Sequence, residues 1–144
     1  MEECGRVEEK YINELAKLCK KAYKKGDVPV GAILVSNNKI IAKAYNKKNI
    51  NNNALYHAEI LCLQKAYRKL KRWNLNDCIL YVSLEPCDLC KLLIEESRIN
   101  KVFYILDKGK CTNKYKKTQY EQTYVFGGDD FSEIMSDFFK KIRK

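Results

Sequence analysis

The sequence lacks any long hydrophobic run. No apolar stretch approaches the ~18–20 consecutive residues of a membrane-spanning helix, and the first residues, MEECGRVEEK, lack the hydrophobic stretch of a signal peptide. We therefore expect a soluble, cytoplasmic protein with no membrane partner. Disorder is also excluded as the default, because 46% of the 144 residues are apolar, and this length suits one domain with a buried core.

The chain has only one histidine, His57, and an odd number of cysteines. Seven cysteines in a cytosolic protein argue against a disulfide framework. Several of them lie in apolar patterns, where a free cysteine behaves as a small hydrophobic residue. Only Cys87 and Cys90 have a spacing that suggests chemistry. The sequence assigns no role to the others, which are Cys4, Cys19, Cys62, Cys78 and Cys111.

Positive charge dominates the composition. Lysine and arginine total 28 against 18 acidic residues, which gives a net charge of +10. A positive field of this size attracts polyanions such as nucleic acids. The abundance of lysine, asparagine and isoleucine is also what an A/T-rich genome produces, so charge alone does not assign a nucleic-acid partner.

Hydrophobic periodicity divides the chain into helices, strands and loops. In its middle, a buried strand, a helix and a second buried strand follow one another, which indicates a βαβ unit and a partly parallel sheet. The pattern predicts one α/β domain over residues 1–144 with a central mixed sheet. The predicted helices cover 7–25, 57–72, 88–96 and 131–142, the strands flank Asn37-Asn38 and cover 78–84 and 101–106, and 46–53 and 107–123 are loops.

His57, Cys87 and Cys90 together have the composition of a catalytic zinc site. Such a site uses three protein ligands and keeps a fourth position for water. Two cysteines at i and i+3 that open a helix can face one ion, and the helix N-terminus favours their thiolate forms. We expect one Zn²⁺ per chain. Glu59, two positions after His57, would take a proton from the activated water and return it to the substrate.

Each of these residues also has a plainer explanation. A Cys-x-x-Cys pair is commonly a redox pair or half of a structural zinc site, and a lone histidine is commonly a core residue. A redox pair would require neither the upstream His-x-Glu nor Pro86. A structural zinc site usually has four ligands, and the chain has no second histidine. The combined pattern therefore favours the catalytic zinc site.

The pattern H-x-E followed by P-C-x-x-C resembles the signature of the zinc nucleoside and nucleobase deaminases. Four further stretches resemble the bacterial tRNA-specific adenosine deaminase family, the TadA type, over nearly the whole chain. They are DVPVGAI (27–33), AYN (44–46), YVSLEPCDLC (81–90) and SDFFKKIRK (136–144). The resemblance implies a single zinc deaminase domain of the CMP/dCMP type. Its cytidine deaminase-like fold would be a three-layer α/β/α arrangement with a central mixed five-stranded sheet.

The resemblance also implies roles for individual residues. His57, Cys87 and Cys90 match the zinc ligands, and Glu59 matches the proton shuttle. The activity implied is conversion of adenosine to inosine at the wobble position of tRNA, by a homodimer that binds the anticodon stem-loop. The matching substrate-binding positions are Asn46 for the base, Val28, Pro29 and Val30 for the pocket wall, and the aromatic pair Phe138 and Phe139 near the anticodon loop.

Two segments depart from the family pattern. Leu55 and Tyr56 stand where members commonly have a small Thr-Ala pair, and a basic, tyrosine-rich segment at 107–123 replaces a glycine-rich one. Contacts to the nucleotides that flank the wobble base are therefore open, as is the tRNA species. The alternatives are a zinc deaminase of a free base or nucleoside, of guanine or cytidine type, and a non-catalytic tRNA-binding or zinc-structural protein. A deaminase of a free base or nucleoside has no use for a charge of +10, and a non-catalytic protein has no use for Glu59.

Overall fold

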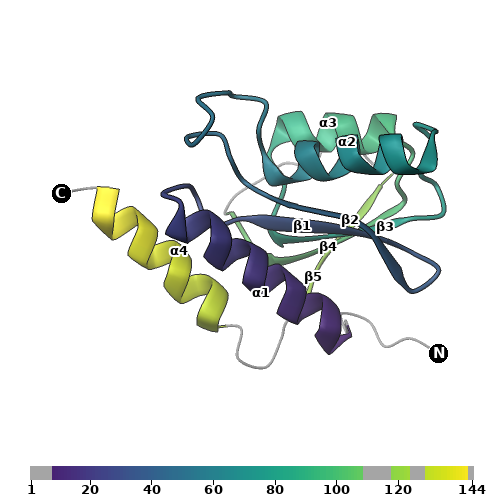
Figure 1. Cartoon of the computed structure of the whole chain (residues 1–144). Helices are drawn as coiled ribbons and strands as arrows, with labels where there is room; N and C mark the ends of the chain where they lie inside the picture. Colours follow the sequence, from purple (N-terminus) through teal and green to yellow (C-terminus); the bar gives the residue numbers. More distant parts are fainter. Residues whose placement is uncertain (1–7, 109–117, 124–128, 143–144) are drawn as a thin grey trace.

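The computed structural model describes residues 8–108, 118–123 and 129–142. In these ranges, helices surround a five-stranded sheet of order β2-β1-β3-β4-β5 (Figure 1). Cys4, Cys111, Arg143, Lys144 and most of the 107–123 segment lie outside the described residues. The strands are β1 (Gly31–Ser36), β2 (Lys39–Tyr45), β3 (Ile79–Leu84), β4 (Lys101–Leu106) and β5 (Gln119–Gln122).

The first two strands form the predicted hairpin. β1 pairs with β2 in antiparallel fashion, and the turn between them places Asn37 at φ 52° and Asn38 at φ 62°. Two successive residues with positive φ are typical of a type I′ turn, in which asparagine is favoured. The Asn37-Asn38 pair therefore sets the hairpin.

The sheet is mixed, as the sequence predicts. β1 pairs with β3 in antiparallel fashion, whereas β3 pairs with β4, and β4 with β5, in parallel. Helix α3 (Asp88–Glu96) makes the crossover between β3 and β4. This arrangement places the loop after β3 and the N-terminus of α3 at the carboxyl edge of the parallel strands, where ligands bind in open α/β sheets.

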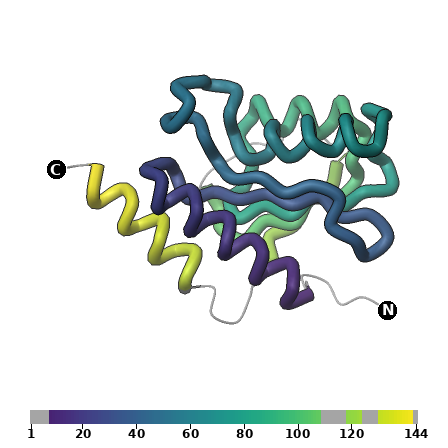
Figure 2. The backbone as a smooth tube through the Cα atoms, in the orientation of Figure 1, coloured from purple at the N-terminus to yellow at the C-terminus, as the bar shows by residue number. Residues whose placement is uncertain are grey.

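Helices cover both faces of the sheet and complete the three-layer α/β/α arrangement (Figures 1 and 2). Helices α1 (Glu9–Lys24) and α4 (Asp129–Ile142) lie side by side on one face. Helix α2 (Ala58–Leu70) lies with α3 on the other face. No helix among the described residues is both long and apolar enough to cross a membrane.

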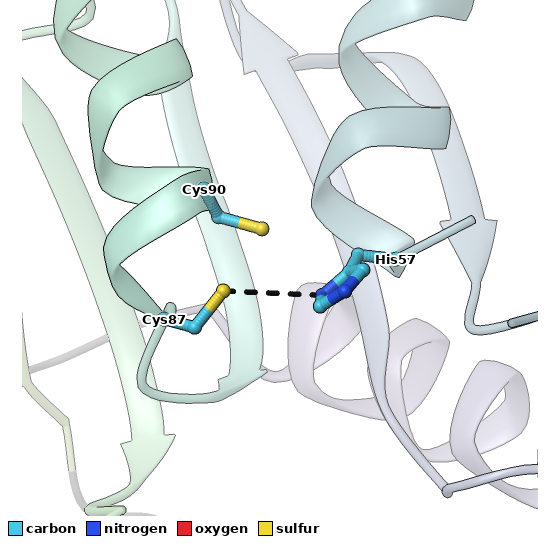
Figure 3. A group of neighbouring side chains, drawn as sticks. All are labelled: His57, Cys87 and Cys90. Carbon is cyan, nitrogen blue, oxygen red and sulfur yellow. Dashed lines mark hydrogen bonds between the residues drawn. The ribbon is translucent and has the colours of Figure 1, made fainter. Parts of the chain in front are cut away.

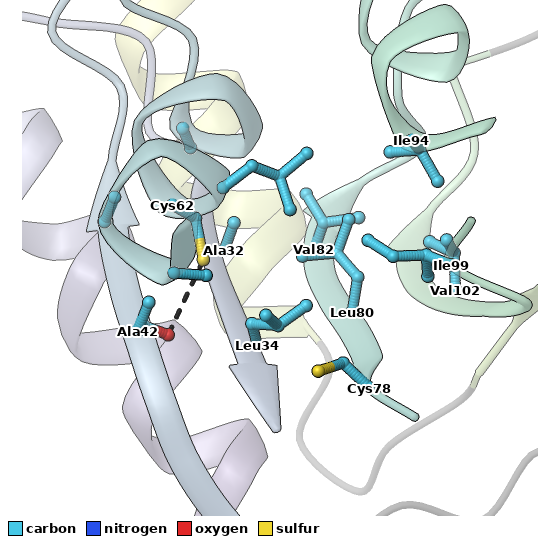
Figure 4. Packing of buried hydrophobic residues seen from close by; sticks show 14 of the residues in the cluster. Ala32, Leu34, Ala42, Cys62, Cys78, Leu80, Val82, Ile94, Ile99 and Val102 are labelled. Carbon is cyan, nitrogen blue, oxygen red and sulfur yellow. Dashed lines mark hydrogen bonds between the residues drawn. The ribbon is translucent and has the colours of Figure 1, made fainter. Parts of the chain in front are cut away.

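Two clusters of buried apolar side chains hold the layers together. On the α2 and α3 face, Leu34, Leu80 and Val82 project from the sheet toward Ile94 of α3 (Figure 4). On the other face, Leu15 and Phe131 bring α1 and α4 against the sheet. Burial of these side chains supplies the main force that fixes the helices on the sheet.

Strand β5 corrects the sequence prediction. Periodicity predicts a loop over 107–123, yet Gln119–Gln122 adds a parallel strand beside β4. The sequence of this strand, QYEQ, has no alternating apolar pattern because an edge strand can be held by backbone pairing to one neighbour. The five strands implied by the family resemblance are therefore present, but the fifth lies where the residue pattern indicated none.

Candidate active site

His57, Cys87 and Cys90 converge between the N-termini of two helices. His57 is the N-cap residue of α2 and Cys87 that of α3, while Cys90 lies in the first turn of α3. Their ligand atoms all lie within 4.8 Å of one another, and Cys87 Sγ lies 4.0 Å from His57 Nδ1 (Figure 3). Because the three side chains point toward one centre, one ion could contact all of them.

The donor set fits zinc. One imidazole and two thiols are ligands that Zn²⁺ prefers, and three protein ligands leave a position open as in catalytic zinc sites. In the part of the chain that the structure describes, no further histidine, cysteine or carboxylate joins this group as a fourth ligand. The group therefore meets the requirements of an open site rather than of a closed structural one.

A hydrogen bond couples the two cysteine side chains. A hydrogen bond from Cys90, helped by the charge of His57, lowers the pKa of Cys87 to about 5 although burial opposes the shift. The same hydrogen bond, together with burial, raises the pKa of Cys90. Cys87 is thus a thiolate at neutral pH, and a divalent cation would favour loss of the second proton as well.

Glu59 lies in the first turn of α2 with only 5% of its surface exposed. Burial raises its pKa to about 7, and the charge of Cys87 adds to the rise, whereas a hydrogen bond from its own backbone N–H lowers it. A carboxylate with a pKa near neutral pH can both accept and return a proton. This is the property that a proton shuttle requires.

A cavity of about 190 Å³ opens beside these groups. It brings together residues from five separate segments, including three of the six predicted substrate positions, Val28, Val30 and Asn46. Pro29 is buried between two lining residues but does not itself line the cavity. The lining residues are Val28, Val30, Asn46, Lys48, His57, Glu59, Leu84, Glu85, Cys87 and Lys108.

Comparison with known proteins agrees with this arrangement. A family model, that of the MafB19-like deaminases, matches residues 7–143. A tRNA-specific adenosine deaminase of Rickettsia bellii is 38% identical over 144 residues, which cover 92% of this chain and 99% of the relative. The chain belongs to the family of the tRNA-specific adenosine deaminases.

Solved structures confirm the cytidine deaminase-like fold of this deaminase. A structure from studies of A-to-I editing by tRNA:A34 deaminases at the wobble position has a TM-score of 0.75 and 26% identity, and the match covers 87% of this chain and 99% of that one. A guanine deaminase of Bacillus subtilis has a TM-score of 0.66 and 25% identity over 96% of each chain. The fold is thus shared by enzymes with different substrates.

Asp27 is a residue of the deaminase site that the sequence did not reveal. Its carboxylate is fully buried and accepts hydrogen bonds from the side-chain amide of Asn46 at 2.9 Å and from the backbone N–H groups of Val28, Asn49 and Ile50 at 2.8–2.9 Å. It therefore fixes Asn46 and the loop that follows β2. The only signal in the sequence is an acidic residue between the helix-ending Gly26 and an apolar strand.

Glu85 and Lys91 form a second contact of the deaminase that the sequence did not indicate. Glu85 lines the cavity, and its Oε2 lies 3.2 Å from Nζ of Lys91, which is 2% exposed. Lys91 follows Cys90 on α3 and reaches back toward the residue before Pro86. A buried carboxylate in the cavity wall is thus held beside a buried cation, and no spacing rule for zinc sites would have predicted the pair.

Phe138 and Phe139 are not among the residues that line the cavity. Phe138 is buried, whereas Phe139 is 37% exposed, and the two ring centroids lie 5.2 Å apart. Lys141, one turn further on, places its Nζ 4.6 Å from the ring centroid of Tyr23 at the end of α1. The structure therefore assigns Phe138 to packing of α4, and a role for Phe139 in tRNA binding stays a prediction.

Leu55 and Tyr56 precede His57, and Leu55 lies in a turn. Leu55 is 58% exposed, and the carbonyl oxygen of Tyr56 accepts a hydrogen bond from the backbone N–H of Lys47. This bond ties the end of the loop at 46–56 to its beginning, so the loop forms one wall beside the cavity. Leu55 is not among the residues that line the cavity.

Proposed function

We propose that this deaminase converts adenosine to inosine at the wobble position of tRNA and holds one zinc ion per chain with His57, Cys87 and Cys90. One observation carries the proposal: a buried carboxylate, Glu59, and a base-sized cavity adjoin the His-Cys-Cys group. The name of the Rickettsia bellii relative and the likeness to tRNA:A34 deaminases support the substrate.

Zinc in this site would lower the pKa of a water toward ~7, and so supply a nucleophile at neutral pH. The overall reaction consumes adenosine and water and yields inosine and ammonia. A bond from C6 to the water oxygen forms, and the bond from C6 to the amino nitrogen breaks.

Glu59 moves the protons in both halves of the reaction. It accepts a proton from the attacking water and delivers it to N1 of the ring, which must be protonated as attack proceeds. It then transfers the second water proton to the amino group, which leaves as ammonia. The pKa of about 7 suits this double task because neither protonation state of Glu59 is strongly favoured.

Asn46 is the candidate group for holding the base. Its side-chain nitrogen is occupied by Asp27, which leaves the side-chain oxygen as the acceptor available to the cavity. Val28 and Val30 give the cavity an apolar wall against which a purine ring can pack. An anticodon-loop base is already unpaired, so its extrusion into the cavity costs only a few kcal/mol.

Two further proposals rest on the family resemblance. We propose that the deaminase acts as a homodimer and that it works in the cytoplasm, where tRNA is found. The net charge of +10 is consistent with a tRNA partner.

Incubation with a panel of unmodified tRNAs, followed by sequencing, tests the substrate. We expect A-to-I conversion at the wobble adenosine and at no other position, and none in a matched tRNA with guanosine there. Absence of conversion in every tRNA of the panel would contradict the proposal.

Metal analysis tests the ligand set separately. Wild-type protein should contain about one zinc per chain, and Cys87→Ala and Cys90→Ala should each lose zinc and activity together. Cys62→Ala is the matched control because Cys62 is also buried but donates a hydrogen bond to the backbone oxygen of Ala42 and does not belong to the His57, Cys87 and Cys90 group. Full zinc content in both ligand variants would rule out the assignment.

A further inference from the structure

A second hollow, separate from the catalytic cavity, lies at the β2 edge of the sheet. It has a volume of about 150 Å³ and lies where α1, β2 and α2 meet. In Figure 1 this is the edge at which α1 ends and α2 begins. We call it the lysine hollow, and its lining includes Leu18, Lys21, Tyr45, Lys47, Leu61 and Lys65.

The local structure explains why lysines gather there. The register of the β1–β2 pairing shifts between Leu34 and Val35. In the part of β2 beyond this shift, Ala42 and Ala44 face α2, while Lys43 and Tyr45 face α1. The two helices contribute apolar side chains near the strand, Leu18 and Leu61, and place a lysine one turn later in each case. The hollow thus has an apolar floor and a cationic rim.

Two lysines that line the hollow, Lys43 and Lys65, are held by contacts within the protein. Lys43 makes an ion pair with Glu14 at 3.1 Å, and Lys65 donates a hydrogen bond to the carbonyl oxygen of Lys43 at 2.9 Å. The second contact satisfies a backbone acceptor on the outer side of an edge strand, where no further strand pairs. These contacts shape the hollow rather than supply binding groups.

The other cations gather around Tyr45. The Nζ atoms of Lys25 and Lys47 lie 5.6 and 5.0 Å from its ring centroid. A hydrogen bond with Lys25, and the charges of Lys47 and Lys21, lower the pKa of the Tyr45 hydroxyl. Among the described residues, no carboxylate lies within ion-pair distance of Lys21, Lys25 or Lys47. Three like charges therefore converge without a carboxylate to offset them.

The lysine hollow adjoins the catalytic cavity through consecutive residues. Asn46 and Lys48 line the cavity, and Lys47 between them lines the hollow. A polynucleotide whose base occupies the cavity can therefore pass over this segment and reach the hollow.

We propose that the lysine hollow binds phosphodiester groups of the tRNA backbone next to the nucleotide whose base enters the cavity. The inference rests on the proposed function. Lysine ammonium groups act as point charges toward phosphate, and contact releases condensed counterions, so the hollow would add affinity without reading sequence. Lysines on an edge strand can also serve to prevent pairing with strands of other molecules. That role requires only that the charges are exposed, and it does not explain why several lysines converge on one concave surface.

A charge-matched pair of double variants tests the hollow. Lys21→Gln with Lys25→Gln removes one cation of its lining and the neighbouring cation that contacts Tyr45. Lys10→Gln with Lys69→Gln removes two exposed charges from the first turn of α1 and the last turn of α2, at the other end of both helices. We expect the hollow variant to keep kcat, to raise KM for tRNA, and to reduce the slope of log KM against log salt by about 2. The control variant should match wild type in all three.

Chemical footprinting gives an independent measurement. Bound tRNA should protect Lys21, Lys25 and Lys47 from acetylation, read by mass spectrometry, and leave Lys10 and Lys69 as reactive as in the free protein. If both double variants behave alike on tRNA and no hollow lysine is protected, the inference is wrong while the proposed function stands. If wild-type protein converts no tRNA, the proposed function itself fails.

Discussion

Four donors share the carboxylate of Asp27 in the loop between α1 and β1. Two of them are backbone N–H groups of Asn49 and Ile50, in the loop after β2, and one is the amide of Asn46. A single buried carboxylate therefore couples the position of Asn46, the proposed base-binding residue, to that of the loop after β2. Hydrogen bonds to a charged group contribute about 1.5–3 kcal/mol each, more than neutral ones.

Asp27→Asn should separate positioning from metal binding. The asparagine side chain would place an NH₂ group where an Asp27 oxygen now accepts hydrogen bonds, so donors would face a donor. We expect a loss of at least about 2 kcal/mol in unfolding free energy and a lower kcat/KM on tRNA, with zinc content unchanged. Denaturant unfolding, steady-state kinetics and metal analysis measure the three quantities. Normal kcat/KM in a destabilised variant would show that Asp27 is structural only.

Glu59→Gln should retain zinc and tRNA binding while turnover falls. The substitution keeps the shape of the side chain but removes the group that moves protons, so kcat should drop by at least ~10²–10⁴. Quantification of inosine formed at saturating tRNA provides the measurement. Near-normal turnover would mean that another group transfers the proton.

At the scale of elements, α1 meets β1 at Gly31. A Cβ atom added there would lie 2.7 Å from Cβ of Leu18 and 3.3 Å from the carbonyl oxygen of Leu15. Both atoms belong to or adjoin the helix backbone, so the helix itself would have to shift. The close approach matters for the site because β1 begins directly after Val28 and Val30, which line the cavity.

Gly31→Ala should therefore destabilise the protein by about 1–3 kcal/mol, the usual cost of overpacking. The sign of the change in unfolding free energy is decisive. At an unobstructed strand position, alanine should instead stabilise the protein by roughly 0.4–1 kcal/mol, because it reduces the conformational entropy of the unfolded chain. Urea denaturation followed by circular dichroism measures it. A more stable variant would show that α1 and β1 are not closely packed at this position.

The aromatic pair of α4 makes a second comparison between elements. Phe138 is 5% exposed, so Phe138→Ala should lower the unfolding free energy by about 3–5 kcal/mol. Phe139→Ala should change stability little, yet loss of one stacked base would cost about 1–3 kcal/mol of tRNA binding. Binding of the anticodon stem-loop measured for Phe139→Ala decides the point. Unchanged affinity would mean that Phe139 has no part in tRNA binding.

The elements also show what could be predicted from the sequence. Strands rich in apolar residues, such as Ile79–Leu84, and the turn at Asn37-Asn38 carry local signals, so both were found. Strand β5 carries none, because its pairing depends on the exposed backbone of β4. His57, Cys87 and Cys90 were recognised by residue type and spacing. Asp27 acts through contacts with a segment about twenty residues away in sequence, which spacing does not encode.

At the scale of the whole molecule, the zinc chemistry and the substrate are separate questions. The same fold serves a tRNA:A34 deaminase and a guanine deaminase at similar identity. This chain carries a net charge of +10, with Lys48 and Lys108 on the cavity wall and the lysine hollow beside it. A small neutral base has no need of these cations, whereas a polynucleotide does.

Ammonia release measured in parallel with several substrates tests the central claim most directly. The zinc-loaded protein should release one ammonia per inosine formed from an anticodon stem-loop with a wobble adenosine. It should release none from free guanine or cytidine at the same concentration. Rapid ammonia release from guanine or cytidine, with none from the stem-loop, would contradict the account.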